Sequence, residues 1–305
     1  MLPLSPYTNA MGEVQRVRLD FGYAGTEFAG WARQPDLRTV QAELEAGLAK
    51  VLRGGSLDRN WVPRVTVAGR TDAGVHARAQ VAHLEIPIGI WDGLPGRSVR
   101  TAEASLIEKL TAVLPSDIVI KKAAIVPAGF DARFSAGSRR YVYRIADHPE
   151  NRDALTNHYV LRWKRQLNVN LMDEAARSLV GLHDFAAFCK QRPGATTIRR
   201  LITFAWRRPL SGPDSGLVVG TIRADAFCHN MVRALVGTII KVGEGRESVT
   251  WPLEVLRKGQ RELAAAIVPA HGLTLEEVTY PPAPFDIERA QNIRLKRQRE
   301  ETSSP

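Results

Sequence analysis

The sequence has little cysteine and no long apolar run. Its 305 residues include only two cysteines, Cys189 and Cys228. Two cysteines give no disulfide framework, and their spacing fits no metal-binding pattern. No stretch approaches the ~20 consecutive apolar residues of a membrane span, and the first residues lack the basic start and apolar core of a signal peptide. These absences predict a protein of the reducing cytoplasm that has no membrane partner.

Motifs of several common enzyme classes are also missing. The chain contains no P-loop, no dinucleotide fingerprint, no serine-centred elbow and no HExxH. Cys228 and His229 have no further clustered cysteine or histidine that would make a zinc site. We therefore expect no cofactor and no metal, and the sequence gives no support to an NTPase, a dehydrogenase or a hydrolase.

Basic residues outnumber acidic ones, and this excess is the first positive signal. The formal net charge is +10 and the sequence pI is about 9.9. A body this basic favours a polyanionic partner, with nucleic acid ahead of a membrane because no basic amphipathic anchor is present. Many basic proteins bind no polyanion, so charge alone leaves the partner open.

Hydrophobic periodicity predicts similar sets of elements in both halves of the chain. Thr39 is a suitable N-cap for an amphipathic helix over residues 40–52. Strands and helices do not alternate strictly, which argues against a doubly wound parallel sheet and favours an α+β fold of two α/β halves with mainly antiparallel sheets. The expected strands cover residues 17–23, 64–68, 79–86, 117–126, 139–146, 200–208, 216–227 and 271–280. Besides the helix over 40–52, the expected helices cover 104–114, 170–181, 229–243 and 251–257.

Four segments follow from this pattern. We expect a flexible leader over residues 1–12, an N-terminal α/β half over 13–127 and a C-terminal α/β half over 128–281. The remaining tail, 282–305, is polar and basic, and its composition predicts disorder.

The stretch "AGRTDAGVHA", residues 68–77, holds the first candidate site residue, Asp72. In an extended segment Arg70 would share a face with Asp72, and a nearby cation favours the ionised form that a nucleophile needs. Gly69 and Gly74 would let the backbone approach a ligand closely. The competing interpretation is an ordinary surface turn, since Asp and Gly are common turn residues.

A second candidate segment, "FDARFSAGSRRYVYRI", covers residues 130–145 and interleaves four arginines with aromatic rings. Cations for phosphates beside rings for stacked bases are typical of RNA recognition. Tyr141 and Tyr143 would equally suit the core of a strand whose arginines are solvated. The residues alone leave both interpretations open.

A third segment, "ADAFCHNMVRALVG", covers residues 224–237. Its apolar positions predict a buried helix. His229 fits a cap or core residue better than a ligand, whereas Arg233 is either a surface residue or a partner for a buried acid.

These three segments, in this order, resemble motifs of the TruA family of tRNA pseudouridine synthases. The matches are "AGRTDAGVHA", "FxARFSAxxRxYxY" and "AFxHxMVR" followed by "VG", with a weaker match at "HGLTL", residues 271–275. One departure is Ala24, where the family usually has Asp after the first strand.

The resemblance implies a role for five residues. Asp72 would be the catalytic nucleophile and Tyr141 the tyrosine that contacts the flipped base. Arg70 would assist base flipping, Arg233 would pair with Asp72, and Leu273 would pack against the base.

The resemblance also implies a fold and a substrate. The fold would be the pseudouridine synthase fold, with two RRM-like halves flanking a central RNA-binding cleft. The protein would act without cofactors as a homodimer on the anticodon arm of tRNA, at uridines 38, 39 and 40.

Two other functions remain as alternatives. A non-catalytic tRNA-binding protein or RNA chaperone would use the same basic surface. A metal-dependent RNase is disfavoured because no second carboxylate lies near Asp72 in the sequence.

Overall fold

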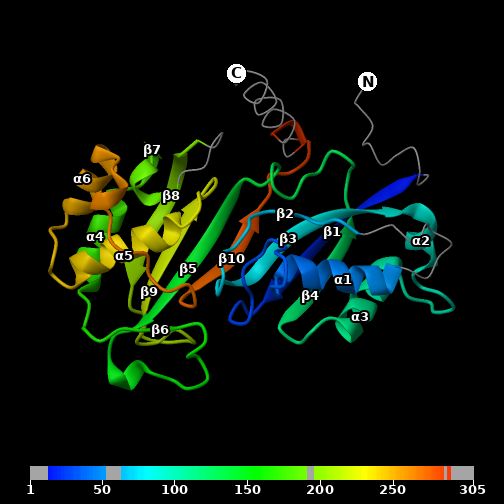
Figure 1. Ribbon diagram of the computed structural model, residues 1–305, viewed down its shortest axis with the longest axis horizontal. Helices are drawn as coiled ribbons and strands as arrows, with labels where there is room; N and C mark the ends of the chain where they lie inside the picture. The colour runs from blue at the N-terminus through cyan, green and yellow to red at the C-terminus, as the bar shows by residue number, and fades with distance from the viewer. Residues whose placement is uncertain (1–12, 53–62, 191–195, 285–286, 290–305) are drawn as a thin grey trace. The chain divides into compact units, whose positions relative to one another are not determined.

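The computed structural model describes residues 13–52, 63–190, 196–284 and 287–289, and these form two compact units (Figure 1). Unit 1 contains the described residues up to Thr71, then Ala77–Ala136 and the described residues from Tyr280 onward. Unit 2 contains Asp72–His76 and Gly137–Thr279. The expected leader and the tail from residue 290 lie outside the described residues. Helices and mainly antiparallel strands occur in both units, which confirms the predicted α+β fold.

Unit 1 is built on an antiparallel sheet with the strand order β4-β1-β3, to which β2 adds by pairing with β3. Val17, Leu19 and Phe21 alternate along β1 and are fully buried, as the period of two predicts. Strand β3 is longer than the sequence predicted, because it begins at His76, inside the motif AGRTDAGVHA. The strands are β1 (Val14–Tyr23), β2 (Thr66–Val67), β3 (His76–Pro87) and β4 (Ile118–Ile125).

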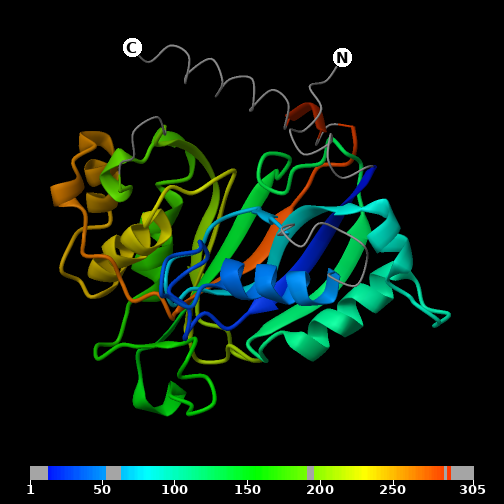
Figure 2. The same cartoon turned by 45° about the vertical axis from the view of Figure 1, so that its right-hand side comes forward.

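Two longer helices of unit 1 lie side by side against its sheet (Figure 2). Thr39 caps the first of them as predicted, accepting a hydrogen bond from the Ala42 amide at 3.4 Å. A short third helix, α2, was not expected from the sequence. The helices are α1 (Val40–Leu52), α2 (Ile88–Gly93) and α3 (Ala102–Val113).

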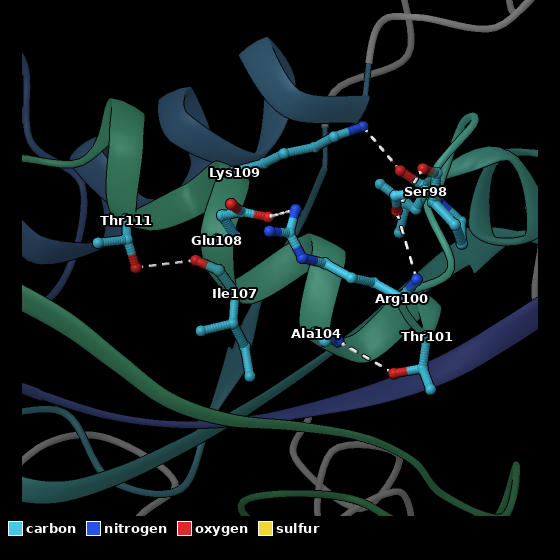
Figure 3. Close-up of polar contacts among 10 residues, drawn as sticks. Ser98, Arg100, Thr101, Ala104, Ile107, Glu108, Lys109 and Thr111 are labelled. Carbon is cyan, nitrogen blue, oxygen red and sulfur yellow. Dashed lines mark hydrogen bonds and ion pairs between the residues drawn. The ribbon is translucent and has the colours of Figure 1, made fainter.

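Polar side chains fix α3 at its start and along its exposed side (Figure 3). The Thr101 hydroxyl accepts from the Ala104 amide at 3.3 Å, which caps the helix. Lys109 then donates to the Leu94 carbonyl at 2.8 Å, joining α3 to the end of α2. These local contacts position α3, and they take no part in the site described below.

In unit 2 the strands of the sheet run in the order β10-β5-β9-β8-β7. All of these neighbours are antiparallel, and β6 pairs with β5 in parallel. Tyr143 faces Leu273 across β5 and β10, and Tyr141 faces Leu275. The strands are β5 (Ser138–Ala146), β6 (Leu161–Arg162), β7 (Gly181–Asp184), β8 (Ile198–Arg207), β9 (Val218–Ala224) and β10 (Leu273–Thr279).

The helices of unit 2 pack on this sheet through α4, which contacts β8 and also α5. Helix α5 is the most deeply enclosed, since every residue in it is buried except Arg233 and Lys241. The core residues expected here, Val236 and Ile239 among them, are buried as predicted. The helices are α4 (Val169–Arg177), α5 (Met231–Gly243) and α6 (Trp251–Lys258).

Candidate active site

The motif that contains Asp72 is held in two parts, and its first part belongs to unit 1. The Thr71 carbonyl accepts from the Trp31 amide at 3.0 Å, and the Thr71 hydroxyl lies 2.7 Å from the Tyr23 hydroxyl. Gln80 donates both to the Gly69 carbonyl at 2.9 Å and to the Tyr23 hydroxyl at 3.2 Å. Burial raises the pKa of Tyr23 to about 12, although these hydrogen bonds act to lower it, so the phenol stays neutral as a structural anchor.

The second part, Asp72–His76, belongs to unit 2 and forms a tight turn. The Val75 amide donates to the Asp72 carbonyl at 3.2 Å, and Gly74 adopts a φ of +79°, a backbone conformation that L side chains rarely adopt. His76 is 5% exposed and its Nε2 lies 2.8 Å from the His158 carbonyl. The turn interpretation and the site interpretation are therefore compatible, because the turn is anchored and carries Asp72 at its first position.

Two side chains, one in the first turn of α5 and one just before this helix, lie against the Asp72 carboxylate. Arg233 Nη1 lies 3.5 Å from Asp72 Oδ2, and His229 Nε2 lies 3.4 Å from Asp72 Oδ1. The Asp72 side chain is 27% exposed, so it is reachable by a ligand. Each carboxylate oxygen thus has its own partner.

Arg233 is itself held in place from the other side. Its Nε donates to the Val268 carbonyl at 2.8 Å, and its side chain is 19% exposed. A guanidinium can make both contacts because its N–H groups point in fixed and different directions. The carbonyl therefore fixes the direction in which Arg233 presents its charge to Asp72.

The loop before β10 connects these groups to the sheet. Tyr143 donates its hydroxyl proton to the Pro269 carbonyl at 2.7 Å. Burial raises the pKa of Tyr143, while the nearby Arg233 charge lowers it by a smaller amount, so this phenol is neutral and structural. A methyl group in place of the Gly74 hydrogen would come within 3.3 Å of the Ala270 Cβ, so the same loop also packs on the motif.

This loop also gives the protein a pH-dependent stability. Burial lowers the pKa of His271 below its ordinary value of 6.5, so the folded state resists protonation that the unfolded state accepts. Below pH 6.5 the unfolded state therefore binds more protons, and stability is lost as the pH falls toward the folded pKa. We expect His271→Gln to reduce the loss of stability between about pH 7.5 and about pH 5.5, measured by chemical denaturation. His183→Gln serves as the control, and an unchanged pH dependence in His271→Gln would contradict the assignment.

Tyr141 and Leu273, two of the residues that the resemblance assigns to the base, lie on one face of the sheet. They occupy neighbouring diagonal positions on β5 and β10, since Tyr141 pairs with Leu275 and Leu273 with Tyr143. Tyr141 is 7% and Leu273 is 4% exposed. The Tyr141 ring meets the Phe227 ring edge-on, with centroids 5.3 Å apart, so Tyr141 packs in the fold as the core interpretation required.

Arg70, the fifth predicted site residue, belongs to unit 1 and is exposed. The described contacts of the Asp72 carboxylate come from Arg233 and His229 and do not include Arg70. Its suggested role in base flipping stays a prediction.

Two of the four arginines in the segment 130–145 are buried and do not offer their charges to a phosphate. Arg144 is 7% exposed and is paired with Asp214 at 2.8 Å and Glu276 at 2.9 Å. Arg139 is also 7% exposed and donates to the Asp225 carbonyl at 2.7 Å. Both guanidinium groups support the sheet of unit 2, because burial of a charge requires such partners. The interpretation of these two arginines as phosphate ligands was wrong.

The two cysteines also differ from expectation. Cys189 and Cys228 are 39 positions apart in the chain, yet they form a disulfide with their Cα atoms 5.6 Å apart. Their spacing carries no information about this pairing, which arises from tertiary packing. Within the described parts of the chain no helix is long and apolar enough to span a bilayer. The same residues include no group of three or more His, Cys, Asp or Glu placed for a metal.

His229 is the contact that sequence reasoning missed. The sequence-based expectation was a cap or core histidine, and its separation of four residues from Arg233 was the available signal. Residues four apart lie on one side of a helix, and both of these side chains reach Asp72 although His229 precedes the first turn of α5.

A carboxylate held by a guanidinium and an imidazole, in a unit whose sheet carries a tyrosine and a leucine on one face, is suited to nucleophilic catalysis by aspartate. The family described as tRNA pseudouridine synthase matches residues 175–281. Similarity to known proteins extends over nearly the whole chain. The tRNA pseudouridine synthase A of Streptomyces griseus is 50% identical over 266 residues, covering 87% of this chain and 88% of its own.

Two further relatives carry the same name. That of Frankia casuarinae is 50% identical over 283 residues, with 92% of this chain and 95% of its own covered. That of Bifidobacterium longum is 45% identical over 299 residues, with coverages of 92% and 99%. The chain belongs to the tRNA pseudouridine synthase family, as the motif resemblance implied.

Proposed function

We propose that the protein converts uridines of the tRNA anticodon stem-loop, at positions 38, 39 and 40, to pseudouridine, with Asp72 as the nucleophile. The observation that carries this proposal is the motif aspartate itself, which is 27% exposed and lies 3.5 Å from Arg233. A nucleophilic carboxylate has to be both accessible and fixed in direction, and Asp72 meets both requirements.

The reaction is an isomerisation in which no atom is gained or lost overall. Asp72 attacks either C1′ of the target nucleotide or C6 of its uracil, and the bond between N1 and C1′ breaks. The base turns and reattaches through C5, and the bond between Asp72 and the substrate breaks, which regenerates the carboxylate. The C5 proton passes to solvent while N1 gains one. Tyr141 contacts the flipped base and its hydroxyl assists the proton transfer. Neither a metal nor an organic cofactor takes part in these steps.

The other groups serve the substrate. Flipping removes the uridine from its stack, and the exposed Arg70 assists that step while Leu273 packs against the displaced base. The net charge of +10 supplies attraction to the tRNA backbone. The protein acts in the cytoplasm as a homodimer on the anticodon arm.

Mapping of pseudouridine in tRNA incubated with the purified protein tests the function. We expect pseudouridine at positions 38 to 40. Modification only at other positions of the tRNA would show that the proposed specificity is wrong. Binding without modification would instead favour the tRNA-binding protein or chaperone. Strand scission that requires Mg²⁺ would favour the RNase.

Tyr141→Phe tests the proposed role of the tyrosine hydroxyl. This change keeps the ring that packs on Phe227 and removes only the hydroxyl, so we expect normal folding with kcat lowered by about 10- to 100-fold. Tyr159→Phe is the matched control, because Tyr159 lies outside the site, at the cluster formed by Val142 and Leu217. Unchanged kinetics of Tyr141→Phe would leave Tyr141 with a packing role alone.

A further inference from the structure

His229 makes a contact with Asp72 to which the motif resemblance gave no role. Its Nε2 lies 3.4 Å from Oδ1, while Arg233 lies on the opposite oxygen, Oδ2, at 3.5 Å. A carboxylate with one partner still rotates about the bond between Cβ and Cγ, and such terminal torsions are broad. A second partner on the other oxygen restricts this rotation.

The segment that carries His229 is fixed at each of four consecutive residues. Phe227 packs its ring against that of Tyr141 at 5.3 Å, and Cys228 is joined to Cys189. The carbonyl of His229 itself accepts from the Lys190 amide at 3.1 Å. Asn230 has a φ of 66°, the left-handed conformation that turns the chain into α5. A segment held in this way gives its histidine a defined position.

The environment allows this contact to strengthen when a substrate is bound. The His229 and Asp72 side chains are 28% and 27% exposed, so solvent screens their attraction in the free protein. A base that covers the site displaces this water, and charge–dipole interactions grow as the local dielectric falls. A neutral imidazole is sufficient, provided that the hydrogen resides on Nε2.

We propose that His229 is a positioning residue for the reaction, which fixes the plane of the Asp72 carboxylate by donating from Nε2 to Oδ1 while Arg233 engages Oδ2. This inference rests on the proposed function, since it assigns His229 to the nucleophile of that reaction. The carboxylate then presents its free lone pairs in one direction, toward the atom under attack. Misplacement of a reacting group by about 1 Å is enough to lower a rate by about 10²-fold.

The test compares His229→Leu with His229→Gln, because glutamine keeps an N–H donor and leucine does not. We expect His229→Leu to lower kcat by about 10- to 100-fold with KM for tRNA unchanged and the protein still folded at the assay temperature. His229→Gln should recover most of that loss. His183→Gln is the matched control, since His183 lies on β7, where its ring is near the Val180 carbonyl and the Phe185 ring. Equal loss in the leucine and glutamine variants, or a rise in KM at constant kcat, would overturn the inference.

A second measurement does not depend on turnover. The changes in Tm caused by Asp72→Asn and His229→Leu, alone and combined, form a double-mutant cycle in the free protein. Contacting residues give non-additive changes, and additive changes would contradict the contact. Absence of pseudouridine with the wild-type protein would contradict the proposed function, while this cycle still decides whether His229 holds Asp72.

Discussion

Asp72→Asn should abolish pseudouridine formation, with kcat lowered by at least about 10³-fold, while tRNA binding is retained. Asparagine has almost the same shape as aspartate, and its amide is not a nucleophile toward C1′ or C6. The change also removes the charge that Arg233 faces at 3.5 Å. Release of tritium from tRNA labelled at C5 of uridine measures turnover, and filter binding measures affinity for the same tRNA.

The control for this experiment is a carboxylate of unit 2 outside the site. Asp153 is exposed and accepts from the Leu155 amide at 2.9 Å, a contact that asparagine can also make, so Asp153→Asn should keep wild-type rates. Full turnover by Asp72→Asn would exclude a nucleophilic role for Asp72. Retained binding together with an inactive wild-type protein would favour the non-catalytic alternative.

Arg233→Met should produce the second largest effect, a loss of about 10²-fold in kcat with a smaller change in tRNA affinity. Methionine keeps much of the apolar stem but removes the charge opposite Asp72 Oδ2. The hydrogen bond to the Val268 carbonyl at 2.8 Å is lost as well. Single-turnover rates with saturating tRNA would separate the effect on chemistry from the effect on binding.

Arg257→Met is the matched control, because Arg257 is exposed in the last turn of α6 and is not among the described contacts of the Asp72 carboxylate. Its loss removes the same charge from the same unit. If Arg233→Met retained wild-type rates, the contact with Asp72 would have no part in catalysis. If both variants lost tRNA affinity equally and kept kcat, Arg233 would act only through the overall positive charge.

Local patterns in the sequence were enough to predict most of the secondary structure. The alternation at Val17, Leu19 and Phe21 and the cap at Thr39 depend on neighbours within a few residues. The motif resemblance drew attention to Asp72 and Arg233, which the structure brings together although they are 161 residues apart. The sequence did not predict that β5 is buried on both faces. A hydrophobicity pattern treats a charged residue such as Arg144 as exposed, although it is buried here.

The remaining features depend on tertiary packing and have no local signal. The disulfide between Cys189 and Cys228 joins two segments that neither composition nor spacing connects. His229, which reaches Asp72, comes just before the left-handed turn at Asn230, and neither the turn nor the contact has a periodic signal. Short helices such as α2 (Ile88–Gly93) have too few residues for periodicity to identify them.

The assignment of Asp72–His76 to unit 2, while residues on both sides belong to unit 1, has a consequence for recombination between homologous genes. A crossover that exchanged only 137–279 would import Arg233 and His229 but leave the host's own nucleophile loop. That loop contacts the His158 carbonyl through His76 and packs on Ala270 at Gly74. Hybrids of this enzyme with distant relatives should therefore be designed with two grafts, the five-residue loop and the unit that receives it.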